Sequence, residues 1–220
     1  MRVLVVTAVP AERDAVTRAW GPDSPATCGV ALDVIAAGVG PAAAAAGAAT
    51  ALTRRPYDLV VSAGIGGGFQ TVAPLGSVVV ADAIVAADLG AETPDGYVPV
   101  TGLGFGTVRH LPPAALVRAV ADATGAVTGT VLTVSTVTGS AARTAELLAR
   151  HPDAAAEAME GFGVAEAAAL HGAPVLEIRA VSNAVGPRDR AAWRIGAALA
   201  ALTTAFGKLV PVLDGWEDHD

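Results

Sequence analysis

The chain contains 220 residues, of which 53% are hydrophobic, and carries a formal net charge of −7 at pH 7. This length suffices for one compact α/β domain with its own core, so we expect a single domain over residues 1–220. Lysine and arginine form no stripe along the sequence, which argues against a protein that binds nucleic acid.

Cysteine and histidine are too sparse to suggest a disulfide or a metal site. Cys28 is the only cysteine, which excludes an internal disulfide and fits a reducing cytosol. The histidines lie far apart, without the spacing of metal ligands, at His110, His151, His171 and His219. We expect neither a metal nor an organic cofactor.

The N-terminus has some features of a targeting segment. The run MRVLVVTAV has one arginine and an apolar stretch, as a signal peptide does, but it is too short and PAERD follows at once. No segment approaches the roughly 20 apolar residues of a membrane helix. The sequence therefore predicts a cytoplasmic protein without a membrane partner.

Apolar strands and alanine-rich helices alternate from the N-terminus. The β-branched run at residues 2–8 is typical of a strand buried on both faces, and Pro10 suits the first turn of the helix that follows it. The other predicted elements of the first half are a strand at 31–37, a helix that opens at Pro41 after a glycine turn, and a strand at 58–63 that ends in the glycine loop 64–68.

The second half continues the alternation. Its predicted elements are strands at 77–86, 127–135 and 175–182, helices at 114–124, 140–150 and 163–171, and a last helix capped by Asp189. In that last helix the side chains expected to face the core are Ile195, Leu199, Leu202, Phe206 and Leu209. Residues 93–106 are predicted to form a long Gly/Pro-rich loop. The alternation predicts a parallel or mixed central sheet with helices on both faces.

Two glycine motifs follow predicted strands. GVGPAA, with Gly38 and Gly40, satisfies a relaxed dinucleotide-binding pattern, but the next strand does not end in the acidic residue that the ribose needs. A nucleotide-binding oxidoreductase therefore stays only as a rival. Gly64, Ile65 and Gly66 begin the second motif, whose backbone amides could approach a ligand oxygen or could simply form a tight turn with positive φ angles.

Four segments, in order, carry a family resemblance. They are TAVPAERDAV, GVGPAAAAAG, VVSAGIGGGFQTVAPLGSVVVAD, and EAMEGFGVAEAA followed by APVLEIRAVSNAVGPRDR. Together they resemble the purine nucleoside phosphorylase and nucleosidase superfamily over nearly the whole chain, and within it the futalosine hydrolase branch. The resemblance to methylthioadenosine/adenosylhomocysteine nucleosidases is more distant. The superfamily resemblance implies a three-layer α/β domain with a mixed, barrel-like central sheet flanked by helices. It also implies a homo-oligomer that cleaves the N-glycosidic bond of a purine nucleoside.

The resemblance also assigns roles to residues. Glu160 matches the residue that binds the ribose hydroxyls, with Met159 packed beside the sugar; without the match it would be an acid at a helix start. Glu12 matches the glutamate that nucleosidases use on the attacking water, although acids are also common in the first turn of a helix.

Asn183 stands where the adenine-cleaving nucleosidases have an aspartate that protonates purine N7. A carboxamide cannot deliver that proton, but it can accept a hydrogen bond from N7–H and donate one to a 6-oxo group. The resemblance thus implies a 6-oxopurine nucleoside, and futalosine is one. The alternative is an asparagine that forms a turn with its own backbone.

The nucleophile is expected to be water. The phosphorylases that this chain resembles hold phosphate with a serine in the glycine loop and an arginine near the first strand, but here Ile65 occupies the loop position. Arg13 lies close to the first strand, without the expected pattern around it. Ser182, beside Asn183, is expected to line the pocket.

Other positions depart from the nucleosidase pattern or have no counterpart in it. Val137 lies in the segment where nucleosidases stack an aromatic on the purine. Trp193 aligns with an aromatic that closes over the site, or it anchors the core. Futalosine carries a benzoate; the cations that could meet it, each of which could equally be a solvated surface residue, are Arg109, Arg188 and Arg190. Glu177 and Arg179 share one face of a strand and are expected to form a structural ion pair.

The expected reaction is therefore hydrolysis of futalosine to hypoxanthine and dehypoxanthine futalosine, in the futalosine pathway of menaquinone biosynthesis. The rivals are a methylthioadenosine/adenosylhomocysteine nucleosidase, a phosphate-dependent phosphorylase of 6-oxopurine nucleosides, and a purine-binding module without catalysis.

Overall fold

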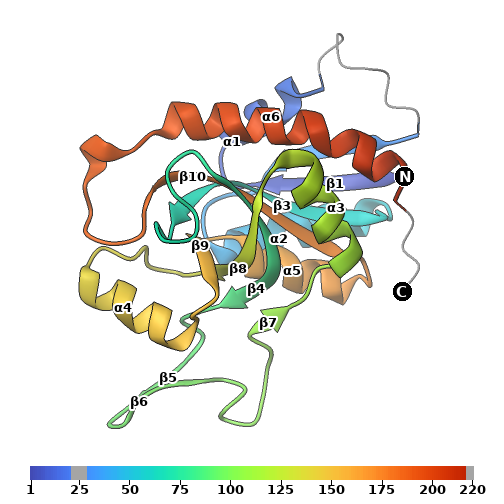
Figure 1. Ribbon diagram of the computed structural model, residues 1–220. Coiled ribbons are helices and arrows are strands. Elements are labelled where there is room, and N and C mark those ends of the chain that lie inside the picture. Colours follow the sequence, from blue (N-terminus) through green and yellow to red (C-terminus); the bar gives the residue numbers. More distant parts are fainter. Residues whose placement is uncertain (21–28, 217–220) are drawn as a thin grey trace.

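A computed structural model describes residues 1–20 and 29–216 (Figure 1). Cys28 and His219, on which two of the composition arguments rest, lie outside the described residues. The elements are β1 (Arg2–Thr7), α1 (Pro10–Arg18), β2 (Ala31–Ala36), α2 (Pro41–Arg54), β3 (Leu59–Gly68), β4 (Val78–Ala86), β5 (Gly90–Thr93), β6 (Gly96–Pro99), β7 (Arg109–His110), α3 (Ala114–Thr124), β8 (Val127–Thr133), α4 (Ala141–Arg150), β9 (Ala154–Ala158), α5 (Gly161–Leu170), β10 (Val175–Ala184), a 3₁₀ helix (Arg190–Ala192) and α6 (Ile195–Asp214).

The main sheet is mixed and closes on itself. Its strand order is β10-β4-β8-β9-β3-β1-β2, and an additional pairing of β10 with β3 joins five of these strands into a ring. Within the ring β10 runs parallel to β3 and antiparallel to β4, while β3 runs antiparallel to β9. β1 and β2 extend the sheet from β3, parallel to it and to each other. The predicted fold class, a mixed barrel-like sheet flanked by helices, is confirmed.

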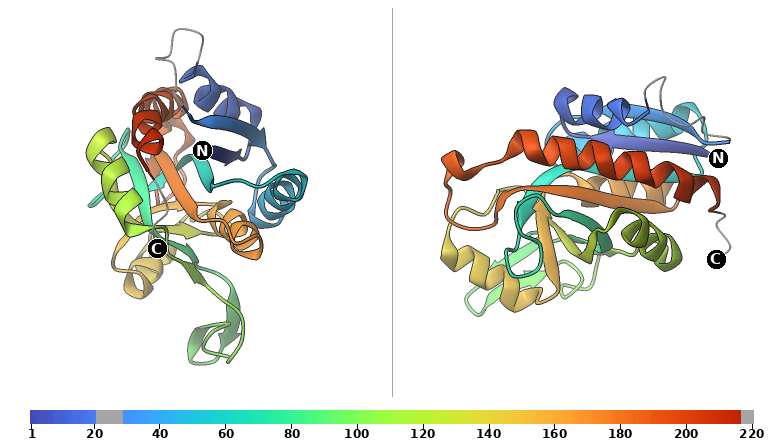
Figure 2. Two further views of the ribbon diagram at one scale, coloured as in Figure 1. Left: turned by 90° about the vertical axis from the view of Figure 1, so that its right-hand side faces the viewer. Right: turned by 45° about the horizontal axis from the view of Figure 1, so that its top comes forward.

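Helices cover both faces of this sheet, as the apolar strand runs predicted. Successive β1 side chains point to opposite faces, so Leu4 and Val6 pack in the cluster of α2 and α5, whereas Val3 and Val5 pack in the cluster of α1, α3 and α6. The left view of Figure 2 shows α3 and α6 on one side of the strands and α2 and α5 on the other. Helix α4 covers a third, smaller cluster through Leu147.

Two predicted loops contain strand instead. Residues 64–68 are not a loop after β3 but its second half, because they pair with β10 on one side and β9 on the other. Residues 93–106 overlap the β5–β6 hairpin, which extends away from the barrel in Figure 1. Strand β9 was not predicted. It is rich in alanine, and pairing with β8 and β3 holds it in extended form, which here overrides local propensity.

The last helix differs from the prediction in three respects. Asp189 caps the short 3₁₀ helix rather than α6, whose N-cap is Arg194. Ile195 is 44% exposed and does not face the core, whereas Leu202 and Phe206 are fully buried. By length and composition α6 could cross a membrane, so the prediction that no segment approaches the length of an apolar membrane helix was wrong. In this structure α6 packs against α1, α3 and β10.

Candidate functional site

A cavity of about 320 Å³ lies where β1, β3, β9 and β10 end, and its volume falls within the range of small-molecule sites. It brings together nine of the ten predicted site residues, from segments spread over most of the chain. They are Glu12, Ile65, Gly66, Val137, Met159, Glu160, Ser182, Asn183 and Trp193. The tenth, Gly64, is not among the residues that line the cavity.

Glu12 is held by three backbone amides. Its Oε2 accepts hydrogen bonds from the N–H groups of Ala8 (3.0 Å) and Val9 (3.2 Å), and its Oε1 accepts one from Ile65 (2.9 Å). The side chain therefore closes the first turn of α1 and lines the cavity, although it is only 4% exposed. The reading of Glu12 as an acid in the first turn of a helix is confirmed, and its position in the cavity wall keeps the predicted role on the attacking water open to test.

Glu160 is clamped from two sides. Its Oε1 accepts a hydrogen bond from the Gly40 N–H at 3.1 Å, and its Oε2 forms an ion pair with Arg179 Nη1 at 3.1 Å. Gly40 has a φ of +92°, a left-handed conformation that favours glycine, and is the N-cap of α2. The GVGP motif that resembled a dinucleotide-binding loop thus presents its amide to a carboxylate of the cavity.

Arg179 is the central cation behind the cavity. It is fully buried, and besides Glu160 it contacts Glu177 Oε1 (Nε, 2.8 Å) and Ser62 Oγ (Nη2, 3.0 Å). Desolvation lowers the pKa of this guanidinium, but the carboxylates of Glu177, Glu160 and Glu12 together raise it above its usual value. The predicted pair with Glu177 is confirmed. Its link to Glu160 was missed, although a charged pair inside an apolar strand is a signal that could have indicated it.

The glycines of β3 provide room rather than turns. No residue of the Gly64–Gly68 segment has a positive φ, so the tight-turn reading is wrong. A Cβ on Gly64 would lie 2.6 Å from Glu12 Oε1 and 2.7 Å from Arg179 Nη1. Gly64 therefore lets these charged groups approach the strand, although it does not itself line the cavity.

Asn183 and Ser182 form one hydrogen-bonded unit near the end of β10. The Ser182 hydroxyl lies 2.8 Å from Asn183 Oδ1 and 3.2 Å from the Gly66 carbonyl oxygen. The Asn183 amide Nδ2 donates to the Ala184 carbonyl at 3.0 Å. Ser182 thereby orients the carboxamide at the edge of the cavity.

Glu157 is a cavity residue that was not predicted from the sequence. It lies on β9, lines the cavity, is 4% exposed, and accepts hydrogen bonds from the backbone N–H (2.9 Å) and hydroxyl of Thr138. Burial raises the pKa of its carboxyl above the usual range. Because β9 itself was not predicted, nothing placed this glutamate at the site.

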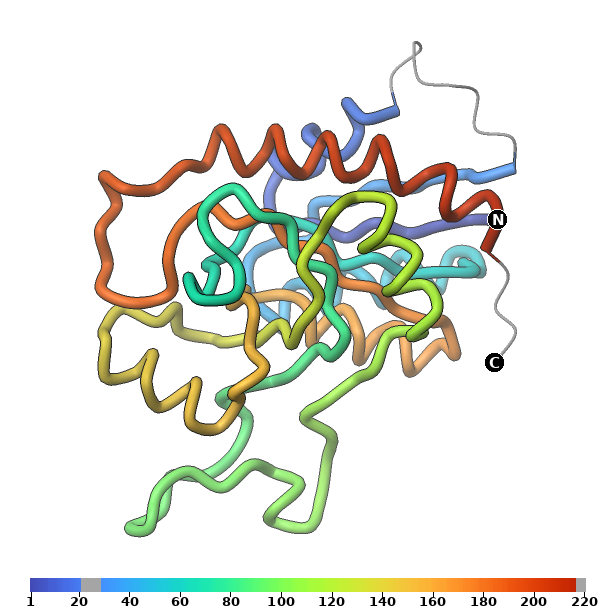
Figure 3. The backbone as a smooth tube through the Cα atoms, in the orientation of Figure 1, coloured from blue at the N-terminus to red at the C-terminus, as the bar shows by residue number. Residues whose placement is uncertain are grey.

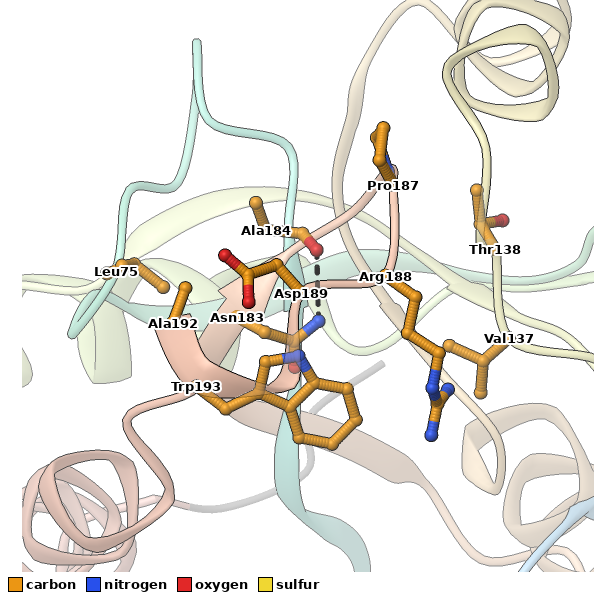
Figure 4. Close-up of a pocket in the computed structure, with 11 residues that line it drawn as sticks. Leu75, Val137, Thr138, Asn183, Ala184, Pro187, Arg188, Asp189, Ala192 and Trp193 are labelled. Atoms are coloured by element: carbon orange, nitrogen blue, oxygen red, sulfur yellow. Dashed lines mark hydrogen bonds between the residues drawn. The ribbon is translucent and has the colours of Figure 1, made fainter.

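A smaller cavity adjoins the first one and shares Val137, Asn183 and Trp193 with it (Figure 4). The Arg188 and Arg190 guanidinium carbons lie 5.2 and 5.9 Å from the centroid of a Trp193 ring. In Figure 3 the chain from β10 to α6 passes beside the segment that leads into α4, and residues of both segments line this second cavity. Arg109, on β7, lines neither cavity.

The described residues contain no group of three or more His, Cys, Asp or Glu side chains arranged to hold a metal ion. Within the same part of the chain, the residues that line the main cavity include no lysine or arginine. Arg13 instead pairs with Asp14 at 2.7 Å, and both side chains are about half exposed.

Comparison with known proteins identifies the family. The model of the Phosphorylase superfamily matches residues 28–210. The futalosine hydrolase of Streptomyces coelicolor is 68% identical over a 236-residue alignment that covers 100% of both chains. The chain belongs to the futalosine hydrolase family. Another member, from Acidothermus cellulolyticus, is 46% identical and matches 94% of this chain and 89% of its own length.

Solved structures agree with this family's fold. The 5′-methylthioadenosine/S-adenosylhomocysteine nucleosidase of S. pneumoniae matches with a TM-score of 0.80 at 19% identity, over 97% of this chain and 100% of its own. A nucleosidase of this kind from Colwellia psychrerythraea, in complex with adenine, gives a TM-score of 0.78 at 24% identity, over 98% and 95%. The members of the family are hydrolases that act on N-glycosidic bonds of purine nucleosides, and the nucleosidases share their architecture.

Proposed function

We propose that this protein hydrolyses the N-glycosidic bond of futalosine and releases hypoxanthine and dehypoxanthine futalosine, in the futalosine pathway of menaquinone biosynthesis. One observation carries the proposal: in a futalosine hydrolase family member, a single cavity holds Glu12, Glu160 and the Asn183 carboxamide and has no cation among its described lining residues.

The reaction places opposite demands on the two ends of the cavity. Breaking the bond between ribose C1′ and purine N9 leaves a sugar with oxocarbenium character and a purine that carries negative charge. Glu160 holds the ribose hydroxyls and favours the developing positive charge, and Met159 packs beside the sugar. The clamp from Gly40 and Arg179 supports this role, because a fixed carboxylate needs no reorganisation during the reaction.

Glu12 acts as the general base on the attacking water. Its three amide donors fix the position of the carboxylate. Oε2 accepts two of these hydrogen bonds and Oε1 only one, so Oε1 keeps a lone pair with which to accept a proton from water. Water is favoured over phosphate as the nucleophile, because Ile65 offers only an apolar side chain and Arg13 is engaged by Asp14 outside the cavity.

Asn183 holds the departing base. Its carboxamide accepts a hydrogen bond from N7–H and donates one to the 6-oxo oxygen, which suits hypoxanthine and not adenine. One Nδ2 hydrogen is donated to the Ala184 carbonyl, and the second is available for the 6-oxo oxygen. Gly64, Ile65, Gly66, Ser182 and Val137 shape or support the walls around it.

The benzoate of the substrate lies towards Trp193 in this proposal. Of the three arginines considered for it, Arg188 lines the adjoining cavity and, like Arg190, lies over the indole, whereas Arg109 lines neither cavity. A cation beside the apolar Trp193 ring is a suitable partner for an aromatic carboxylate.

We further propose a cytoplasmic homo-oligomer. Apolar side chains are exposed after the β5–β6 hairpin at Leu103 (43%) and Phe105 (61%), and elsewhere at Leu111 (68%) and Leu170 (80%). Contiguous exposed apolar patches mark surfaces that associate, and Leu103 and Phe105 lie two residues apart on the chain. Light scattering on the purified protein would give the subunit number, and a monomer at micromolar concentration would contradict this proposal.

A substrate panel tests the function. The purified protein is incubated with futalosine, inosine, methylthioadenosine and adenosylhomocysteine, with and without phosphate, and free base is followed by chromatography. We expect hypoxanthine from futalosine at the same rate in both buffers. Adenine from the thioether nucleosides would favour the nucleosidase rival, and turnover that requires phosphate would favour the phosphorylase.

A further inference from the structure

Glu157 is a buried carboxylate in the cavity to which the reaction above gives no role. Burying an ionisable group costs free energy unless specific partners compensate, and here burial has raised the pKa of the carboxyl. If Glu157 served only as the hydrogen-bond partner of Thr138, a neutral side chain could take that role without the cost of burying a charge. The position therefore points to a ligand group that needs a strong acceptor.

The strand register places Glu157 opposite Asn183. Glu157 on β9 pairs with Gly67 of β3, and Gly67 pairs on its other side with Asn183 of β10. Strands lie about 4.8 Å apart, so the backbones of Glu157 and Asn183 are separated by roughly 10 Å across a glycine. Both side chains line the cavity, and a Cβ on Gly67 would lie 2.9 Å from Val185 Cγ2 and 3.2 Å from Asn183 Nδ2. Gly67 thus lets Val185 and the Asn183 amide pack close to β3, while the Glu157 carboxylate and the Asn183 carboxamide border the same cavity.

Hydrogen-bonding capacity remains on the Glu157 carboxylate. Thr138 donates its backbone N–H to Oε1 and its hydroxyl to Oε2. An ionised carboxylate has about four acceptor sites and no donor. Each oxygen thus keeps a lone pair after Thr138 is satisfied, and a donor on a ligand in the cavity can use it.

We propose that Glu157 accepts a hydrogen bond from N1–H of the 6-oxopurine base, opposite Asn183, and so determines base specificity; this rests on the proposed function. A 6-oxopurine carries a hydrogen on N1, whereas a 6-aminopurine presents a lone pair there. In the second case two acceptors face each other in a buried site, which rejects the wrong base. Glu157 and Asn183 then read two separate edges of the purine.

The test compares hypoxanthine with 1-methylhypoxanthine, in which a methyl group replaces the hydrogen on N1. Calorimetric titration of the wild-type protein should show binding weakened at least 100-fold by the methyl group, since a site built to bind a donor rejects analogues that lack it. In Glu157→Gln the single amide oxygen must accept the hydrogen bonds from Thr138. The ratio of the dissociation constants of 1-methylhypoxanthine and hypoxanthine should therefore be at least tenfold smaller than in the wild type. Glu166→Gln is the matched control: Glu166 lies on α5 outside the cavity lining and contacts His110.

The outcomes separate the two proposals. The role of Glu157 is overturned if the wild-type protein binds the two bases with dissociation constants within threefold of each other. It is also overturned if a folded Glu157→Gln keeps the wild-type ratio of these constants. Hypoxanthine release from futalosine would stand in both cases. Failure of the wild type to release hypoxanthine from futalosine overturns the proposed function. If Glu157→Gln does not fold, Glu157→Met has a similar length and no comparable acceptor and carries the same measurement.

Discussion

Gly64→Ala should impair catalysis through a single methyl group behind the cavity. Gly64 lacks a positive φ, so alanine can adopt its backbone conformation and the effect is purely steric. The new Cβ would lie 2.6 Å from Glu12 Oε1, whereas ordinary van der Waals contacts begin at 3.4 Å, so the carboxylate must move by close to 1 Å.

The cost of that displacement follows from how Glu12 is held. Its three donors are backbone amides of the β1–α1 turn and of β3, which cannot follow the side chain. A misplacement of about 1 Å costs about 100-fold in rate, equivalent to roughly 2.7 kcal/mol in the activation free energy. The added methyl group also overpacks the site and should lower the free energy of unfolding by about 1–3 kcal/mol.

Steady-state hypoxanthine release gives kcat and KM, and thermal melting gives stability. We expect kcat to fall far more than KM rises. Gly207→Ala in α6 is the control, because a Cβ there meets nothing within 4 Å; it should leave kcat unchanged and stabilise the helix by about 0.5–1 kcal/mol. If Gly64→Ala kept kcat within threefold of the wild type, the tight packing of Glu12 against β3 would have no part in catalysis.

Three further predictions follow from the site and its surroundings. Glu12→Gln should abolish turnover but keep hypoxanthine binding, and a near-normal rate would remove Glu12 from the mechanism. Asn183→Asp should shift the preference towards 6-aminopurine nucleosides, as ratios of kcat/KM for futalosine and methylthioadenosine would report; an unchanged ratio would contradict the reading of the carboxamide. Burial, with Arg150 nearby, lowers the pKa of His151, so the folded state disfavours its protonation. Its contribution to stability is full above about pH 6.5 and is lost as the pH falls through the depressed folded value. His151→Asn should therefore flatten the dependence of unfolding free energy on pH between 7.5 and 5.5, measured by urea denaturation, and an unaltered slope would contradict this assignment.

The order of helices and strands along the chain could be predicted from the sequence, because it depends on the chemistry of neighbouring residues. β-branched runs, Pro10 and Pro41 at helix starts, and helical spacing in the last segment place most elements within a few residues of their observed bounds. The family resemblance also named nine residues that the fold gathers into one cavity. These patterns concern neighbours in sequence, or motifs whose residues lie close together along the chain.

Contacts between distant segments were decided only by closure of the barrel. Pairing of β3 with β9 and β10 turned a presumed glycine loop into a strand, and it placed Glu157 and Asn183 on either side of Gly67. The same closure set Arg179 against Glu160 and brought the Gly40 amide to that carboxylate. No local pattern encodes such contacts, because a glycine or a buried charge acquires its role from the strand that comes to lie beside it.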